Sequence, residues 1–104
     1  MAGLLTPYAA YDLVTAIKKK VDLPIHLHCH ATTGMSEVSY LKGIEAGASI
    51  IDTAISSMAL GTSQPATESM VAALKGTPYD TGIDLGLLEA VSYTHLTLPT
   101  NREV

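Results

Sequence analysis

Three of the four histidines in this 104-residue chain stand at alternate positions of one short apolar stretch. The stretch reads "LPIHLHCHATTG", residues 23–34, and contains His26, His28 and His30. On a β-strand, residues at i and i+2 point to the same side and lie roughly 6.5–7 Å apart, so two imidazoles can reach one ion. The pattern therefore indicates a divalent-metal site. The alternative is a strand that tolerates buried, hydrogen-bonded polar groups.

The histidines nearest the carboxyl end of this strand are the better candidates for metal ligands. In parallel α/β folds active sites form at that end, which selects His28 and His30. His26 would lie deeper, either hydrogen-bonded in the interior or supporting the site. Two imidazoles leave a divalent ion short of ligands, so oxygen donors must come from elsewhere. Such a mixed set suits zinc, cobalt and manganese alike.

Fewer signals point to chemistry outside this stretch. Asp52, in the second predicted strand, is a candidate for contacting substrate or supporting a ligand, and a bond to neighbouring backbone is the alternative. Gln64, in a loop rich in Ser and Gly, is a candidate substrate contact, although a cap or turn residue fits its position too. Cys29 is out of phase with the histidines and is expected to pack as a small hydrophobe. His95 is not counted as functional.

The elements that must position these residues alternate between helix and strand. The pattern predicts a helix starting at Thr6-Pro7, a strand over 25–30, a helix over about 36–46, a strand over 49–54, a helix opening at Pro65 and a helix beginning near Asp84. Inward apolar faces are expected from Val38, Leu41 and Ile44 in the second helix and from Met70, Val71 and Leu74 in the third. A helix between two strands predicts a parallel sheet and an α/β fold.

The composition excludes several classes of function. Hydrophobic residues make up 47 % and charged residues 15 %, which fits strands buried on both faces and argues against disorder. The net charge is −4 and the only basic cluster is Lys18 to Lys20, so a nucleic-acid partner is not expected. One cysteine, no signal peptide and no apolar run of membrane-spanning length predict a cytoplasmic location.

The last fourteen residues, "VSYTHLTLPTNREV", continue no earlier periodicity. They resemble the translated sequencing-adapter remnant found at the ends of some metagenomic reading frames. We therefore expect residues 91–104 to be a foreign or disordered tail. The alternative is an edge strand, because "YTHLTL" alternates between apolar and polar residues.

Four stretches together resemble the carboxyltransferase domain of biotin-dependent enzymes. They are "MAGLLTPYAAYDLV", "LPIHLHCHATTG", "EAGASIIDTAISSMALGTSQPATES" and "GTPYDTG", within residues 1–90. The resemblance implies a (β/α)8 TIM barrel with a divalent ion at its carboxyl-terminal mouth. About two strands and three to four helices of the barrel would lie in this chain. The family's H-x-H ligands match His28 and His30. Its other ligands, an aspartate on the first strand and a carboxylated lysine, are not found here, so we expect an internal fragment that is inactive alone.

Within that family, "HCHATTG" is most similar to the alpha subunit of oxaloacetate decarboxylase. Pyruvate carboxylase comes second and a related aldolase-type lyase third. The resemblance implies carboxyl transfer between oxaloacetate or pyruvate and biotin carried on another domain of the full-length protein. It also implies a homo-oligomer and, for the decarboxylase, membrane subunits coupled to sodium export, with a peripheral place at the inner membrane. From a different class, the alternative is a non-catalytic α/β module with buried histidines.

Overall fold

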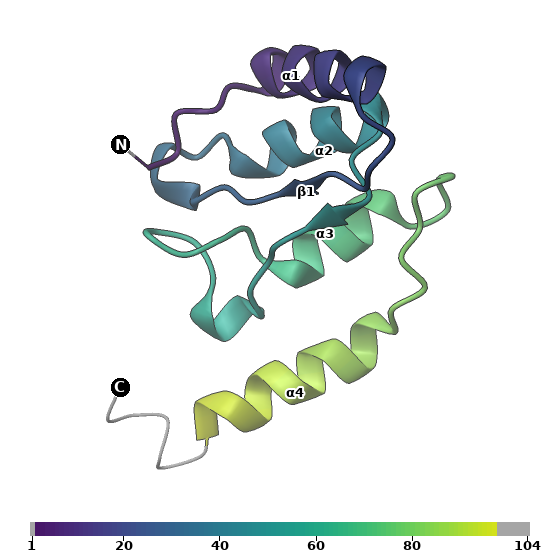
Figure 1. Cartoon of the computed structure of the whole chain (residues 1–104). Helices are drawn as coiled ribbons and strands as arrows, with labels where there is room; N and C mark the ends of the chain where they lie inside the picture. The colour runs from purple at the N-terminus through teal and green to yellow at the C-terminus, as the bar shows by residue number, and fades with distance from the viewer. Residues whose placement is uncertain (1, 98–104) are drawn as a thin grey trace.

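The computed structural model describes residues 2–97, which form four α-helices, two short strands and two 3-10 helices (Figure 1). The elements follow the order α1 (Pro7–Lys20), β1 (His26–Leu27), η1 (Ala31–Thr33), α2 (Ser36–Ala46), β2 (Ile50–Ile51), η2 (Ser56–Met58), α3 (Thr67–Leu74) and α4 (Leu85–Thr97). Helices and strands alternate through α3, which confirms the predicted α/β class. Within the described residues, no helix has the length and apolar character needed to cross a bilayer.

The two strands pair in parallel, as predicted. His26 lies opposite Ile50 and Leu27 opposite Ile51. A further parallel bridge joins Ala54 to Ala66. The paired strands are shorter than the predicted ranges, but the alternation continues beyond β1, because the side chain of Cys29 is buried like that of Leu27. The histidines therefore share the opposite face of this segment, as their spacing predicts.

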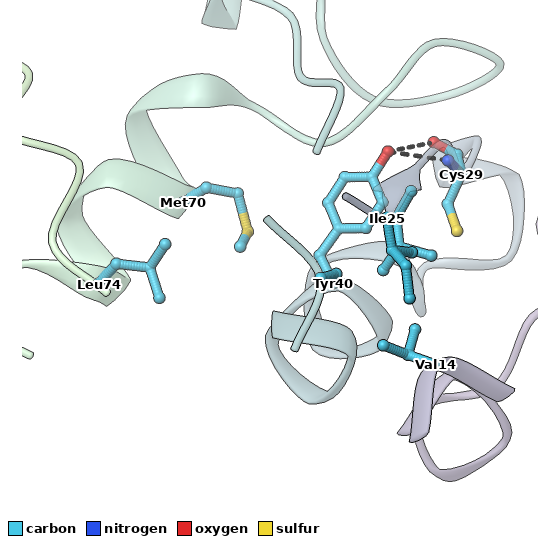
Figure 2. Packing of buried hydrophobic residues seen from close by; sticks show 8 residues of the cluster. Val14, Ile25, Cys29, Tyr40, Met70 and Leu74 are labelled. Carbon is cyan, nitrogen blue, oxygen red and sulfur yellow. Dashed lines mark hydrogen bonds between the residues drawn. The ribbon is translucent and has the colours of Figure 1, made fainter. Parts of the chain in front are cut away.

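The core lies between the sheet and helices α1, α2 and α3. Figure 2 shows Tyr40 beside Ile25, with Val14 and the α3 side chains around them. The cluster of buried residues consists of Val14, Ile25, Leu27, Cys29, Tyr40, Ala48, Met70 and Leu74. The predicted inward face of the third helix is confirmed, since Met70, Val71 and Leu74 are all nearly inaccessible.

Helix α2 packs through a different face from the one predicted. Val38 and Leu41 are exposed, and of the three expected residues only Ile44 contacts the core. The buried face instead carries Tyr40, Gly43 and two serines. A Cβ atom at Gly43 would come within 2.2 Å of Leu27 Cδ1, so α2 approaches β1 too closely for a larger side chain. The close approach of α2 to β1 therefore requires a small residue at position 43. A pattern of apolar residues cannot reveal that requirement.

Helix α3 begins at Thr67, two residues after the predicted opening at Pro65. Extended backbone pairing causes the delay. The Ala54 N–H donates to the Pro65 carbonyl at 3.0 Å, and the Thr67 N–H donates to the Ala54 carbonyl at 2.7 Å. Pro65 and Ala66 thus continue the sheet before the helix starts.

Helix α4 begins next to Asp84, as predicted, and continues to Thr97. The predicted boundary at residue 90 falls inside this helix. An edge strand over residues 93–98 is wrong as far as residue 97, which is helical. The foreign origin of residues 91–104 stays a prediction, and residues 98–104 lie outside the described part of the chain.

Candidate metal centre

The structure brings His28 and His30 together at the carboxyl end of β1. Their Nε2 atoms face each other at 3.2 Å. The two rings are steeply inclined, with an interplanar angle of 78° and centroids 5.0 Å apart. The Nε2 atoms of the two candidate ligands are therefore close neighbours.

The other nitrogen of each ring is held by an oxygen acceptor from the following strand and loop. His28 Nδ1 lies 2.8 Å from Asp52 Oδ2. His30 Nδ1 lies 2.5 Å from the Thr62 carbonyl oxygen. A carbonyl or carboxylate oxygen only accepts, so both rings must carry a hydrogen on Nδ1. In the neutral imidazoles, both Nε2 atoms therefore present lone pairs.

Two neighbouring lone pairs repel unless a cation lies close to both, either a proton, when one ring is protonated and donates to the other, or a metal ion. Ligand nitrogens about 2.0–2.1 Å from a tetrahedral zinc ion would be about 3.3 Å apart, close to the 3.2 Å observed. Metal-bound histidines usually donate their second ring N–H to a carboxylate or a backbone carbonyl, which is the arrangement here. The pair thus fits a divalent ion. No group of three or more His, Cys, Asp or Glu side chains among residues 2–97 could hold a metal, so further donors must come from outside this set.

Asp52 links two of the three histidines. Its second oxygen, Oδ1, lies 2.7 Å from His26 Nε2. The hydrogen bond from His26, followed by that from His28, holds the pKa of the Asp52 carboxyl below its usual value. Asp52 therefore accepts as a carboxylate and fixes the orientation of the His28 ring. This contact agrees with the supporting role considered for Asp52 from the sequence.

Exposure does not separate His26 from His28 within the described chain, and the deeper position expected for His26 stays a prediction. Its side chain is 52 % exposed and that of His28 is 54 % exposed. The face of the sheet that carries them is open to solvent in the described chain. The alternative of a module with buried histidines therefore does not match these two residues. The hydrogen bond that His26 makes to Asp52 agrees with a supporting role.

The loop after β2 contacts the histidine pair through Thr62 rather than through the predicted candidate Gln64. The Gln64 side chain accepts a hydrogen bond from Ser63 at 3.4 Å. Within the described residues, no hydrogen bond links that side chain to the histidine pair, and its contact with substrate stays a prediction. Thr62 instead acts through its backbone carbonyl, and any residue type supplies that group. The sequence therefore carries no signal that could have identified it.

Behind the pair, Cys29 and Tyr40 are buried. The thiol packs as a small hydrophobe, and burial raises its pKa. The Cys29 N–H donates to the Tyr40 hydroxyl at 2.8 Å. Burial raises the pKa of Tyr40 to about 12, so this hydroxyl keeps its proton. Neither group is exposed for proton transfer.

Comparison of the sequence with known proteins identifies the family of this chain. Residues 1–94 match the HMGL-like family. A pyruvate carboxylase subunit of Methanocaldococcus jannaschii is 59 % identical over 91 residues, which are 88 % of this chain and 16 % of the relative. The methylmalonyl-CoA carboxyltransferase 5S subunit of Propionibacterium freudenreichii subsp. shermanii is 50 % identical over 93 residues, covering 88 % of this chain and 18 % of the relative.

A solved structure shows the same fold. It is the carboxyl transferase domain of Rhizobium etli pyruvate carboxylase with pyruvate and biocytin. The match has a TM-score of 0.86 and 40 % sequence identity, and it covers 89 % of this chain and 16 % of that domain. The chain thus spans less than a fifth of the length of each of these three proteins. Its two parallel strands and four helices correspond to a part of a TIM-barrel domain, and the chain belongs to the HMGL-like family.

Proposed function

We propose that His28 and His30 are two ligands of the divalent-metal centre of a biotin-dependent carboxyltransferase that acts on pyruvate or oxaloacetate. The observation that carries the proposal is the pair of Nε2 atoms facing each other at 3.2 Å while both Nδ1 atoms are engaged. The substrate class is supported by the similar carboxyl transferase domain, which was solved with pyruvate and biocytin, a conjugate of biotin and lysine.

Carboxyl transfer of this kind needs a positive charge near the enolate oxygen of pyruvate. Loss of the carboxyl group from oxaloacetate leaves the enolate of pyruvate, and a bound divalent ion supplies Lewis acidity for that oxyanion. The described residues contribute the two imidazoles and the groups that orient them. Asp52 keeps the His28 hydrogen on Nδ1, and the Thr62 carbonyl does the same for His30. Biotin would be delivered on another domain of the full-length protein.

A finer assignment, to the alpha subunit of oxaloacetate decarboxylase, is favoured by the similarity of "HCHATTG", with alanine at position 31. In that case membrane subunits coupled to sodium export would be partners at the inner membrane. The relatives named above are a pyruvate carboxylase subunit and a methylmalonyl-CoA carboxyltransferase subunit, so they do not single out the decarboxylase. Sequencing the source DNA on both sides of this reading frame separates the two. A neighbouring membrane-subunit gene favours the decarboxylase, and a biotin carboxylase gene favours pyruvate carboxylase.

The metal half of the proposal is tested by titrating the chain with cobalt(II) and recording visible absorption. Both His28→Ala and His30→Ala should abolish the cobalt spectrum. His26→Ala is the graded comparison: its ring contacts Asp52 rather than the Nε2 pair, so the cobalt spectrum should persist, with weaker affinity at most. Equal binding by all three variants would contradict the assignment of the ligands.

The catalytic half needs a complete barrel. Residues 1–90 should be placed in the M. jannaschii pyruvate carboxylase subunit in place of the matching segment, and biotin-dependent carboxylation of pyruvate measured. We expect the chimera to be active and His28→Ala to remove the activity. The isolated 104-residue chain should show no turnover, because ligands beyond the histidine pair are missing from its described residues. A folded, metal-loaded but inactive chimera would overturn the proposal.

A further inference from the structure

The backbone that carries the histidine pair leaves the sheet before it reaches the ligands. Strand β1 ends at Leu27, whose carbonyl accepts the Asp52 N–H at 3.2 Å. The Ala31 N–H donates to the Ser63 carbonyl at 2.7 Å. Between these anchors lie His28, Cys29 and His30. Something else must fix the backbone at Cys29 if the two rings are to keep their separation.

The Tyr40 hydroxyl provides that anchor. It accepts the Cys29 N–H at 2.8 Å and donates to the Cys29 carbonyl oxygen at 3.4 Å. Figure 2 shows both bonds, with the tyrosine ring reaching from α2 towards the segment after β1. Tyr40 is 0 % exposed, so water cannot replace its hydroxyl without a rearrangement of the core. One side-chain oxygen thus pairs the N–H and C=O groups that a neighbouring strand would pair in a longer sheet.

We infer that Tyr40 is a positioning residue for the histidine pair: its hydroxyl holds the Cys29 backbone so that the Nε2 atoms of His28 and His30 face one another. The inference rests on the proposed function of that pair as metal ligands. Successive side chains of an extended segment point to opposite faces, so the backbone at Cys29 sets the directions of both neighbours. Metal sites need their ligands held within about 0.5 Å of the productive geometry.

A purely structural role for Tyr40 makes a different prediction. If the ring only fills the core, phenylalanine should serve as well, apart from a loss of stability when two buried backbone groups lose their partner. If the hydroxyl positions the pair, phenylalanine should also disturb the ligand geometry. Residues that orient metal ligands typically change metal affinity by about 10- to 100-fold when they are replaced.

The test is Tyr40→Phe, with cobalt(II) affinity and visible absorption as readouts. We expect affinity to fall by about tenfold or more, with a shifted spectrum. Tyr11→Phe removes an exposed hydroxyl and should change neither readout. Val71→Ala removes core volume from α3 and should lower the melting temperature without changing the cobalt spectrum. Wild-type affinity and spectrum in Tyr40→Phe, with binding lost in His28→Ala, would overturn the inference while leaving the proposed function intact.

A measurement without metal separates the positioning role of Tyr40 from the proposed role of the histidine pair as metal ligands. Nitrogen-15 NMR of the imidazoles reports the tautomer and surroundings of each ring in the apo chain. Tyr40→Phe should shift the signals of His28 and His30, while Tyr11→Phe should not. Unchanged signals would overturn the positioning role, whether or not the pair binds cobalt. If Tyr40→Phe does not fold in the isolated chain, the same comparison is made in the chimeric barrel.

Discussion

Two consecutive units of the chain repeat the same order of elements, a strand, a 3-10 helix and an α-helix. The first covers residues 26–46 and the second covers residues 50–74. The first unit supplies both imidazoles of the candidate metal centre. The second supplies the acceptors that orient them, the Asp52 carboxylate and the Thr62 carbonyl. The first unit therefore supplies the ligands and, through Tyr40, their backbone anchor, whereas the second unit holds the Nδ1 side of both rings.

The largest effect is expected from the packing within the first unit. Leu27→Ala should lower the free energy of unfolding by about 2–5 kcal/mol, because it opens a cavity under α2. Gly43→Ala should cost about 1–3 kcal/mol by overpacking, partly offset by better helix propensity. Its new Cβ would lie 2.2 Å from Leu27 Cδ1, the atom that Leu27→Ala removes.

The double variant, Leu27→Ala with Gly43→Ala, tests whether the contact between positions 43 and 27 causes the loss of stability in Gly43→Ala. With both substitutions present, the alanine at position 43 fills space vacated at position 27. The combined loss should then be clearly smaller than the sum of the two single losses, as urea unfolding of the four chains would measure. Strictly additive losses would show that the close approach of α2 to β1 does not govern the stability of this unit.

The second unit should affect the site more than the stability. Asp52→Asn keeps one acceptor oxygen but cannot accept from both His26 and His28 as a carboxylate does. We expect about 10- to 100-fold weaker cobalt binding, with little change in the melting temperature because the side chain is 40 % exposed. Asp12→Asn, on the exposed surface of α1, serves as the control. Unchanged cobalt affinity in Asp52→Asn would show that the contact with Asp52 does not orient the His28 ring for metal binding.

The difference between the units also explains what the sequence could predict. The alternation of apolar residues and histidines correctly assigns the two sides of residues 25–30, because burial follows the two-residue period directly. It also places His28 and His30 on one side. The parallel pairing follows from one intervening helix and is confirmed. These features depend on local pattern, which a single sequence carries.

Features that depend on close contact between elements could not be predicted. The inward face of α2 is set by the space that Leu27 leaves at Gly43, so Val38 and Leu41 face outward despite their apolar spacing. The Thr62 carbonyl and the Tyr40 hydroxyl act on backbone or ring groups from other elements. The Thr62 contact is known only once the two units are docked, and the Tyr40 contact only once α2 packs against the segment after β1.

A smaller, pH-dependent effect is expected where the second unit holds its own loop. Both Glu68 carboxylate oxygens accept the Ser56 N–H, at 2.9 and 3.0 Å. Partial burial tends to raise the pKa of Glu68, but the hydrogen bonds from Ser56 and from the backbone N–H of Glu68 itself together outweigh it, and the net shift is downward from 4.5. A lowered pKa in the folded state adds stability above about pH 4.5, and this stability is lost as the pH falls through the lowered value.

Thermal melts between neutral pH and a pH below 4.5 test whether the Glu68 carboxylate stabilises the loop. At neutral pH, Glu68→Gln should reduce stability by less than about 1 kcal/mol. The difference from the parent chain should shrink as the pH falls below 4.5. Glu89→Gln, on the exposed side of α4, should show no such convergence. A difference that is constant with pH would mean that the charge of Glu68 does not stabilise the loop.

The smallest effect is expected from a buried hydroxyl in the second unit, Ser57, which is compared with a hydrogen-bonded hydroxyl in the first unit, Ser39. In the first, Ser39 Oγ donates to the Leu5 carbonyl at 2.7 Å, so Ser39→Ala should cost about 0.5–1.5 kcal/mol. In the second, Ser57 Oγ is buried with no hydrogen-bond partner among the described residues. Ser57→Ala keeps the backbone N–H that donates to Ser92 and removes only the unpaired oxygen. Its unfolding free energy should therefore be unchanged or slightly higher. If Ser57→Ala lowers the unfolding free energy as much as Ser39→Ala does, the Ser57 hydroxyl must have a hydrogen-bond partner. The loop after β2 would then be as fully hydrogen-bonded as the first unit.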